Sequence, residues 1–323
     1  MTKPKIVMMY GDKPNHGDYD NGVWQDILGI PFVEIEDALE PYDIIINTLW
    51  LEATGRNKRI KMRWPNKILI GLSDHPLSTH ISKLPPQSQL EYIADLEYCD
   101  GIMALTEEER QWYQVALPSK PVIKAGLPFP FDSYVEKYGK FIGSEKKYIG
   151  LGVGASDNDR NFITSLLVFN RLKLDFPEIQ GVFLSIPDNL LSKVVPLADS
   201  SEDVFIHQRE GMGGFYDVLS QCHFVLGMAD RNTPGRIQGE AAFFGVPVIG
   251  SNRLELQNEL FPDLAVSPYA AEKAVNLAKV LLHETHTNTA IIELAQKRLE
   301  QYNYRKSKKK FFDLIKEIEA RRG

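Results

Sequence analysis

A short polar segment beginning near residue 228 holds the side chains best placed for chemistry. An apolar strand is expected to end at Gly227, Gly235 lies in the following loop, and a helix is expected to begin near Arg236. Asn232 and Glu240 fall on either side of this helix start. Free backbone N–H groups at a helix N-terminus attract anions such as phosphate. The segment is therefore where we first expect an anionic ligand.

The same segment resembles the donor-site signature of GT-B glycosyltransferases that carry an E-x7-E motif (family 4-like, "glycosyl transferases group 1"). In that family a glycine lies five residues before a glutamate-alanine pair, as Gly235 and Glu240 do here. The resemblance implies that Glu240 accepts hydrogen bonds from the donor ribose and that the N–H groups of Gly235 and Arg236 face the diphosphate. Asn232 replaces the family's first glutamate, so the resemblance places it among the catalytic residues, near the transferred sugar. This departure leaves the sugar and the level of activity open.

A second glycine-rich strand end precedes Arg160. By resemblance Arg160 falls where the family has a lysine, and its cation would neutralise the diphosphate leaving group. The glycines also satisfy a dinucleotide-binding pattern, Gly150-x-Gly152-x-x-Ala155, which is typical of nicotinamide enzymes. Such enzymes need an acid about 20 residues further on, and Asp188 lies well beyond that distance. We therefore treat an NAD-dependent or sugar-nucleotide-modifying enzyme as an alternative and not as the main prediction.

Two Asp-x-Asp pairs have the spacing with which some transferases bind a divalent cation, but they do not predict a metal site here. Residues 18–20 and 157–159 both fall in expected loops. Such short patterns arise easily by chance. The chain also has only two cysteines and no His-Glu-x-x-His pattern. We expect no metal and no required cofactor beyond the nucleotide-sugar co-substrate.

Two loops in the first half of the chain carry further candidates. Asp74 and His75 precede a proline after an expected strand, where the resemblance implies an acceptor loop with histidine and aspartate in the opposite order. A carboxylate or imidazole there would accept the proton of the acceptor hydroxyl or orient the sugar. Gly11 ends the first strand, where this fold brings backbone close to the donor phosphates. His16 and Asp18 follow as acceptor contacts by the same fold-level analogy.

A run of six cations within residues 56–67 is prominent in a chain whose net charge is −6. We expect five residues of this run to contact an anionic acceptor: Arg56, Lys58, Arg59, Arg63 and Trp64. DNA phosphates and an anionic membrane are the two alternatives, with Trp64 stacking on a base or lying at the lipid interface. A third alternative is that the run is only a solvated surface with no ligand. We favour DNA because the run has few apolar residues, and a second basic cluster lies in residues 305–310.

Apolar runs that alternate with amphipathic segments predict parallel sheets covered by helices. Strands are expected near residues 6–10, 32–35, 43–48, 67–72, 101–105, 121–125, 148–153, 181–186, 204–207, 224–227 and 246–250. The fold class is therefore α/β, and the resemblance implies GT-B: two Rossmann-like domains facing across a cleft. We expect an acceptor domain over 1–130, a linker over 131–147, a donor domain over 148–303, and a basic helix over 304–323. By resemblance, that helix crosses back to the first domain.

Length and composition agree with two globular domains. The chain has 323 residues, of which 43% are hydrophobic and 25% charged. Its two cysteines exclude a disulfide framework. No apolar stretch reaches the roughly 18 residues of a membrane span, and the N-terminus shows no signal-peptide core. We therefore expect a cytoplasmic protein, in the host cytoplasm if a phage encodes it.

The sequence thus predicts an enzyme, a hexosyl- or pentosyltransferase that moves a sugar from a nucleotide-sugar to a hydroxyl group. A UDP-sugar is the commonest donor in the family that it resembles, and that family retains the anomeric configuration. A hydroxymethylated base in DNA, as in phage DNA glycosyltransferases, is one acceptor candidate, and a membrane lipid or cell-surface glycan is the other. A non-catalytic homologue that binds a nucleotide is a further alternative. We infer no stable protein partner.

Overall fold

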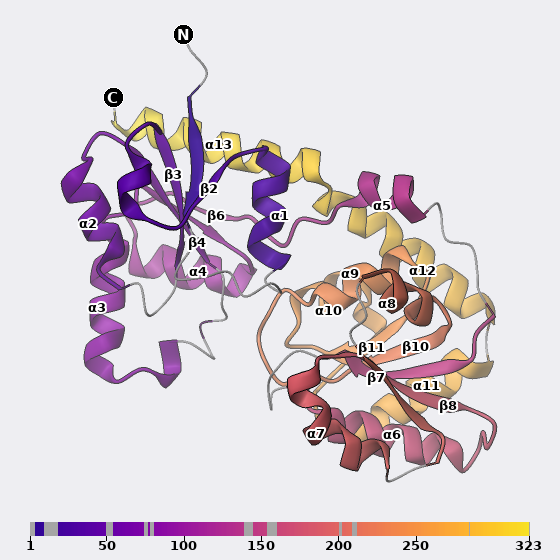
Figure 1. The fold of residues 1–323 in the computed structure, drawn as a ribbon. Helices are drawn as coiled ribbons and strands as arrows, with labels where there is room; N and C mark the ends of the chain where they lie inside the picture. The colour runs from indigo at the N-terminus through magenta and orange to yellow at the C-terminus, as the bar shows by residue number, and fades with distance from the viewer. Residues whose placement is uncertain are drawn as a thin grey trace. The chain divides into compact units, whose positions relative to one another are not determined.

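The computed structural model describes residues 4–9, 19–49, 54–73, 77, 81–138, 145–153, 160–199, 202–208, 212–283 and 285–322. The chain forms two compact units (Figure 1). Unit 1 comprises Met1–Pro130 and Tyr302–Gly323, and unit 2 comprises Phe131–Gln301. Each unit has one six-stranded sheet with helices packed on it, so the predicted α/β class with two Rossmann-like domains is confirmed.

All strand pairings in the sheet of unit 1 are parallel, in the order β2-β1-β3-β4-β5-β6. Every residue of the four central strands is buried, as expected for a parallel sheet covered on both faces. The strands are β1 (Ile6–Met9), β2 (Phe32–Val33), β3 (Ile44–Leu49), β4 (Ile68–Ser73), β5 (Gly101–Ala104) and β6 (Val122–Lys124).

Alternate strand residues build a separate core on each face of this sheet. Ile44 and Ile46 pack with Trp24 on one face, whereas Ile45 packs with Tyr92 on the other. The helical segments of unit 1 are α1 (Tyr19–Leu28), η1 (Glu36–Leu39), α2 (Arg56–Arg63), η3 (Ile81–Lys83), α3 (Pro86–Leu96), α4 (Glu107–Ala116) and α13 (Tyr304–Arg322).

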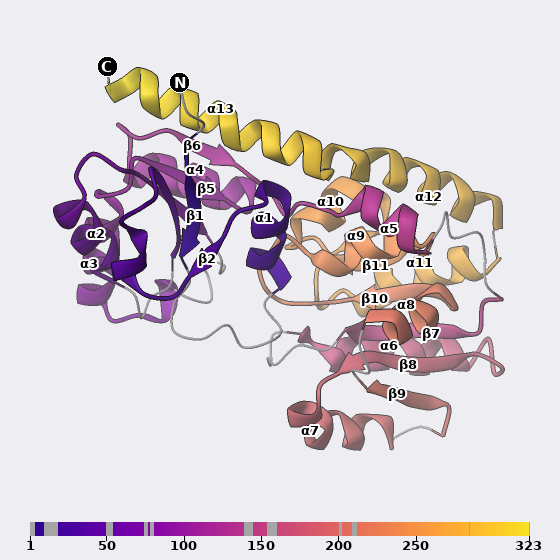
Figure 2. The same cartoon turned by 45° about the horizontal axis from the view of Figure 1, so that its top comes forward.

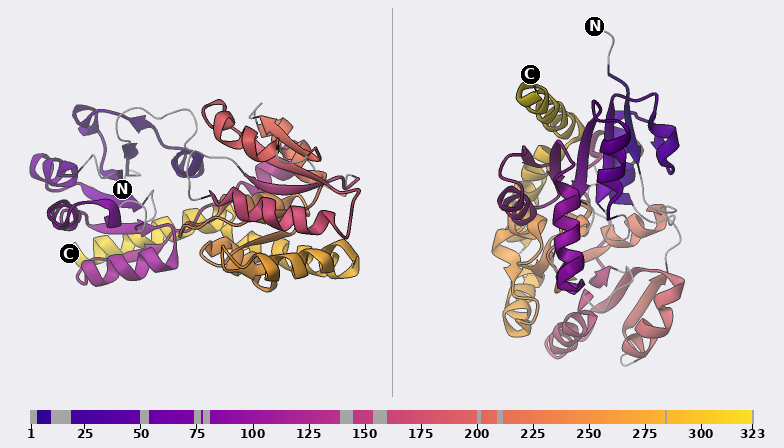
Figure 3. Two further views of the ribbon diagram at one scale, coloured as in Figure 1. Left: turned by 90° about the horizontal axis from the view of Figure 1, so that it is seen from below. Right: turned by 90° about the vertical axis from the view of Figure 1, so that its left-hand side faces the viewer.

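Helix α13 lies on unit 1, although it comes from the end of the chain (Figure 2). Its apolar residues Phe311, Ile315 and Ile318 are buried in the same core as Trp24. The packing is close, since a Cβ on Gly101 of β5 would lie 2.9 Å from Cδ1 of Ile318. In Figure 3 this yellow helix runs beside the indigo-to-magenta elements of unit 1. The burial of these apolar residues therefore holds α13, the 19-residue helix at the end of the chain, against the first half of the chain.

Unit 2 also has a parallel sheet, in the order β12-β11-β10-β7-β8-β9. This is the doubly wound arrangement in which the chain starts in the middle, builds outward on one side, and then returns to build the other. The strands are β7 (Tyr148–Val153), β8 (Gln180–Ile186), β9 (Val204–Gln208), β10 (Cys222–Gly227), β11 (Val248–Ser251) and β12 (Ala265–Val266).

Part of the expected linker is helical and belongs to unit 2. Residues 131–138 form α5, and its Tyr134 ring packs on Tyr216 and Phe243. The remaining helical segments of unit 2 are α6 (Phe162–Lys173), α7 (Asp188–Ala198), α8 (Met212–Ser220), α9 (Arg236–Phe243), α10 (Glu255–Leu260), η5 (Pro262–Leu264), α11 (Ala271–His283) and α12 (Thr285–Leu299), while η6 (Glu300–Tyr302) leads into unit 1. Within the described ranges, no helix has the length and apolar character to cross a membrane.

Candidate functional site

The strongest candidate site lies at the carboxyl ends of β7 and β10 in unit 2. β7 and β10 are neighbours in the middle of the sheet. After β7 the chain continues through α6 to β8 on one side of this pair, and after β10 it continues through α9 to β11 on the other side. Parallel α/β sheets bind ligands beyond the strand ends at such a reversal. Asn161 at the start of α6 joins the two sides. Its Nδ2 donates to the carbonyl oxygens of Met228 (3.2 Å) and Pro268 (2.7 Å), so the preceding Arg160 is held at this edge.

Helix α9 begins at the same edge with a glycine in a left-handed conformation, which glycine adopts readily because it has no Cβ. Gly235 has a φ of +83°, and a Cβ there would lie 2.6 Å from Oε1 of Gln238. Within the described part of the chain, no side chain hydrogen-bonds to this helix start as a cap. The N–H groups of the first turn, beginning with Arg236, are therefore suited to an anion.

The buried side-chain amides of two glutamines link this turn to neighbouring elements. Gln238 and Gln257 are both 0% exposed, and Gln238 Nε2 donates to Gln257 Oε1 over 3.3 Å. Gln257 Nε2 in turn donates to the carbonyl oxygen of Val248 over 2.8 Å. The start of α9 is thus linked through side chains to α10 and β11, and it is held in one place.

Glu240 is buried and lies in a charged hydrogen-bond network. The residue is only 4% exposed, and its Oε1 accepts hydrogen bonds from Arg236 Nε (2.9 Å) and Tyr216 Oη (3.2 Å). Tyr216 also shares a hydrogen bond with Tyr134. Burial, followed by the negative charge of Glu240, raises the pKa of Tyr216, and burial also raises the pKa of Tyr134. Both phenols therefore keep their protons at neutral pH and act as donors.

The loop between β10 and α9 is anchored on both sides of Asn232. Asp230 forms an ion pair with Arg253 and accepts a hydrogen bond from Tyr269. On the other side, the N–H of Glu255 donates to the carbonyl oxygen of Thr233 over 3.1 Å. Asn232 is half-buried between these anchors. Its position is thus fixed by α10 and by the segment after β12.

Of the residues predicted for the donor side, Gly235, Arg236 and Glu240 lie together at the start of α9, with Asn232 in the loop before it. Arg160 precedes Asn161, whose side chain bonds to Met228 in that loop. Two residues of this network, Tyr216 of α8 and Tyr134 of α5, were not predicted from the sequence. No spacing rule relates them to Glu240, because the hydrogen bond between the two tyrosines spans 82 residues. Their only sequence signal was their aromatic type within helical segments.

The residues predicted in the loops of unit 1 cannot be placed in the same way. Gly11, His16, Asp18, Asp74 and His75 all lie outside the described residues. Nothing in the structure therefore tests the acceptor loop that the resemblance implied.

The predicted anion-contacting run, Arg56 to Trp64, is helix α2 with its following residue. Arg59 pairs with Glu36 over 2.8 Å, Arg63 pairs with Asp37, and the Arg63 guanidinium stacks on the Trp64 ring at 4.5 Å. These contacts occupy two of the exposed arginines and Trp64 within unit 1.

The start of α2 is held by a buried carboxylate. Asp95 of α3 accepts from the backbone N–H groups of Asn57 (3.3 Å) and Lys58 (3.0 Å), and Arg56 beside them is 9% exposed. Lys58 has an exposed side chain. These contacts give the run a structural role within unit 1, and its predicted contact with an anionic acceptor stays a prediction.

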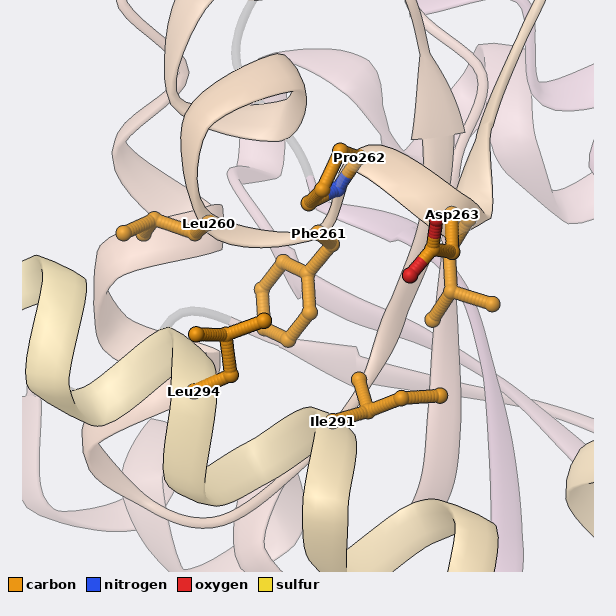
Figure 4. A pocket seen from close by; sticks show the side chains of 7 residues that line it. Leu260, Phe261, Pro262, Asp263, Ile291 and Leu294 are labelled. Atoms are coloured by element: carbon orange, nitrogen blue, oxygen red, sulfur yellow. The ribbon is translucent and has the colours of Figure 1, made fainter.

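Two other features of the described residues bear on ligand binding. Among the residues that the structure describes, no group of three or more His, Cys, Asp or Glu side chains could hold a metal ion. A small apolar hollow lies where α10 and η5 meet α12, and Figure 4 shows Phe261 facing Ile291 and Leu294 there. It is lined almost entirely by aliphatic and aromatic carbon and shares no residue with the polar site at α9.

Comparison with known proteins shows similarity in fold without detectable similarity in sequence. No family model matches the chain, and no curated protein matches it. Solved structures do match. HepE of Anabaena in complex with UDP has a TM-score of 0.75 at 12% identity, with 97% of this chain and 100% of that chain covered.

Two synthases match over similar lengths. A UDP-forming α,α-trehalose-phosphate synthase from Burkholderia xenovorans has a TM-score of 0.73 at 12% identity, covering 95% of this chain and 80% of that one. The sucrose-phosphate synthase of Thermosynechococcus elongatus has a TM-score of 0.73 at 10% identity, covering 98% and 100%. These neighbours are GT-B glycosyltransferases, and this chain has their fold of two Rossmann-like domains.

Proposed function

We propose that this protein is a glycosyltransferase whose nucleoside diphosphate sugar, most simply a UDP-sugar, binds at the β7–β10 edge of unit 2. The observation that carries the proposal is the arrangement at α9. A helix start suited to an anion lies one turn before a buried carboxylate that Tyr216 and Arg236 hold in place. The GT-B fold supports it, since HepE, a neighbour of that fold, was solved with UDP.

The chemistry follows from where charge develops. When the glycosidic bond of the donor breaks, negative charge builds up on the leaving diphosphate. Arg160 and the first N–H groups of α9 would stabilise that charge, as fixed donors do at a developing oxyanion. Glu240 would accept hydrogen bonds from the ribose hydroxyls. The acceptor hydroxyl would attack the anomeric carbon on the face that the diphosphate leaves, with retention, and its proton would pass to the departing diphosphate, so no protein nucleophile is needed. A metal is not needed either, because Arg160 and the N–H groups of α9 would offset the charge of the diphosphate.

Nucleotide binding tests the proposal directly. The melting temperature is measured with UDP, GDP, dTDP, ADP, CMP and NAD. A ligand at 100 times its Kd stabilises by about 2.7 kcal/mol, which raises Tm by several degrees for a chain of this size. We expect one nucleoside diphosphate to give this shift and Glu240→Gln to weaken its binding at least tenfold, roughly the loss of one charged hydrogen bond.

The matched control is Glu272→Gln, which removes an exposed carboxylate from α11 in the same unit and should leave binding unchanged. A shift with NAD alone would replace the proposal with a nicotinamide enzyme. Equal binding by wild-type protein and Glu240→Gln would remove Glu240 from the site.

For the acceptor we propose a hydroxyl compound, with a hydroxymethylated base in DNA as the specific candidate to test first. Transfer from the donor that binds is followed with hydroxymethylated DNA, unmodified DNA and a lipid extract in parallel. Product on the first alone supports the DNA acceptor. Product on the lipid extract alone replaces it with a membrane lipid.

The second candidate is a nucleotide-binding protein without transferase activity. Asn232 favours it, because the resemblance has a glutamate at this position, next to the transferred sugar. Binding of a nucleoside diphosphate together with no donor hydrolysis and no transfer to any acceptor would make this the better account.

A further inference from the structure

The first two turns of α13 form a basic surface that the donor site does not use. Helix α13 holds eight of the 37 lysines and arginines of the chain, and five of them lie within residues 305–310, where there is no acid. These five residues are exposed: Arg305, Lys306, Lys308, Lys309 and Lys310. The rest of the chain therefore carries more negative charge than the net value of −6 suggests.

This placement opposes the electrostatics of a helix. Cations near a helix N-terminus meet the positive end of the helix dipole, which disfavours them by about 0.3–1 kcal/mol each. Arg305 and Lys309 also stand four residues apart on one face, and like charges at this spacing repel. An isolated protein gains no stability from such an arrangement.

The contacts divide these cations into two groups. Lys308 Nζ donates to the carbonyl oxygen of Ile27 over 3.2 Å at the end of α1, and Lys310 lies 5.9 Å from the centre of the Tyr302 ring. Arg305, Lys306 and Lys309 make no side-chain hydrogen bond or ion pair with any residue that the structure describes. We call these three residues the α13 basic face.

Three exposed arginines elsewhere on the surface do have carboxylate partners. Arg59, Arg63 and Arg171 are exposed to a similar degree, and each faces a carboxylate of its own unit: Glu36, Asp37 and Asp175. The two basic clusters of the sequence are therefore not equivalent. In the α2 cluster, Arg59, Lys61 and Arg63 pair with carboxylates of unit 1, whereas the α13 basic face has no described counter-charge.

We propose that the α13 basic face binds the phosphate backbone of a nucleic acid. The three cations lie within five residues of one helix, or roughly 6 Å along its axis. A duplex offers about one phosphate charge per 1.7 Å of its axis, so closely spaced cations meet closely spaced anions. Contacts of this kind position a duplex without reading its sequence.

A lipid surface fits these residues less well. Helices that bind membranes bury an apolar face in the bilayer. The apolar side of α13 is already buried in the core of unit 1, and none of the large hydrophobic residues that are exposed in the described chain lies in α13. Binding would depend on charge alone, and a nucleic acid presents the higher charge density.

The experiment compares two variants of the full-length protein that lose the same number of cations. The first is R305Q/K306Q/K309Q, and the second is R59Q/R63Q/R171Q, whose cations have carboxylate partners. Affinity for a fluorescent 20-base-pair duplex is measured by anisotropy over a range of salt concentrations. Vesicles containing anionic lipid are tested alongside, and no sugar nucleotide is added, so the result is independent of the proposed transferase.

We expect the wild-type protein to bind the duplex with a salt-dependent affinity. The α13 variant should bind roughly 100-fold more weakly near 0.1 M salt, with a salt slope smaller by about 2–3, the release of about 0.9 counterions per contact. The second variant should keep most of the wild-type affinity. The Tm of the α13 variant should equal or exceed that of wild type, because the substitutions remove repulsion.

Three results would overturn the proposal. Equal weakening of the two variants would show that net charge or α2 binds the duplex. Binding of wild type to vesicles but not to the duplex would replace the nucleic acid with a membrane. Binding to neither would show that the α13 basic face is a solvated surface.

Discussion

Tyr216 of α8 donates a hydrogen bond over 3.2 Å to Oε1 of Glu240 in α9, and Arg236 donates to the same oxygen over 2.9 Å. The carboxylate is thereby held in one orientation inside unit 2, where Glu240 is 4% exposed. A ligand hydroxyl that reaches Glu240 meets a carboxylate that needs no reorganisation, which is how a supporting layer of side chains prepares a binding group.

Removing the hydroxyl group of Tyr216 should destabilise the protein while leaving its fold intact. Tyr216→Phe leaves a buried carboxylate oxygen with one donor fewer, which costs about 2 kcal/mol for a bond to a charged group. Urea denaturation measures the change in the free energy of unfolding. Tyr269→Phe is the matched control, since it removes a hydrogen bond to Asp230 from a tyrosine that is 64% exposed, and it should cost less than about 0.5 kcal/mol. Equal losses in the two variants would contradict the role of burial.

A second prediction concerns the two glycines at the ends of α9. Gly235 and Gly245 both have positive φ, +83° and +68°. A Cβ at Gly235 would lie 2.6 Å from Gln238 Oε1, whereas a Cβ at Gly245 would meet its nearest atom at 3.9 Å. Gly245→Ala should cost about 1 kcal/mol for the backbone alone, and Gly235→Ala about 2–3 kcal/mol because Gln238 must also move. The difference between their Tm values checks this. If Gln238 adjusts freely, the two variants will melt together.

The third prediction tests the buried cap of α2. Asp95 is 6% exposed and accepts from the N–H groups of Asn57 and Lys58. Asp95→Ala leaves these donors unsatisfied in a buried setting and should cost about 2–3 kcal/mol. Asp37→Ala, which removes the exposed partner of Arg63, should cost less than about 1 kcal/mol. Chemical denaturation of both variants decides between a structural cap and a dispensable charge.

The fourth prediction is a dependence of stability on pH that one histidine controls. Burial, and then the positive charge of Lys146, lowers the pKa of His223 below its ordinary 6.5. The unfolded chain therefore binds more protons than the folded one just below pH 6.5, so stability falls as the pH drops through that window. Between about pH 7.5 and about pH 5.5, the Tm of His223→Gln should fall less than the Tm of the wild-type protein. Parallel pH profiles would assign the acid sensitivity to other groups.

Much of the fold was predictable, because its signals are short-range. The strand predicted over residues 148–153 is β7, and Thr106 begins α4 with the capping box that a Thr-x-x-Glu sequence is typical of. The helix predicted over residues 304–323 is α13 (Tyr304–Arg322), and its apolar side is buried. Each of these signals depends on residues within one or two turns of each other, where local geometry decides the outcome.

The candidate site was predictable only where its residues share one segment. Gly235, Arg236 and Glu240 belong to one helix start, so their spacing alone brought them together. Tyr134 and Tyr216 reach the same carboxylate from helices that only the packing of unit 2 places beside α9.

By itself, then, the sequence determined the alternating α/β pattern and the helix start at Gly235. Only the tertiary structure decided which charges are neutralised. Arg59 and Arg63 meet Glu36 and Asp37 because α2 packs beside η1, whereas the three cations of the α13 basic face meet no described acid. The physical reason is that an ion pair needs two side chains within about 4 Å. Where the partners lie more than 20 residues apart, the packing of elements sets that distance, and the local sequence does not.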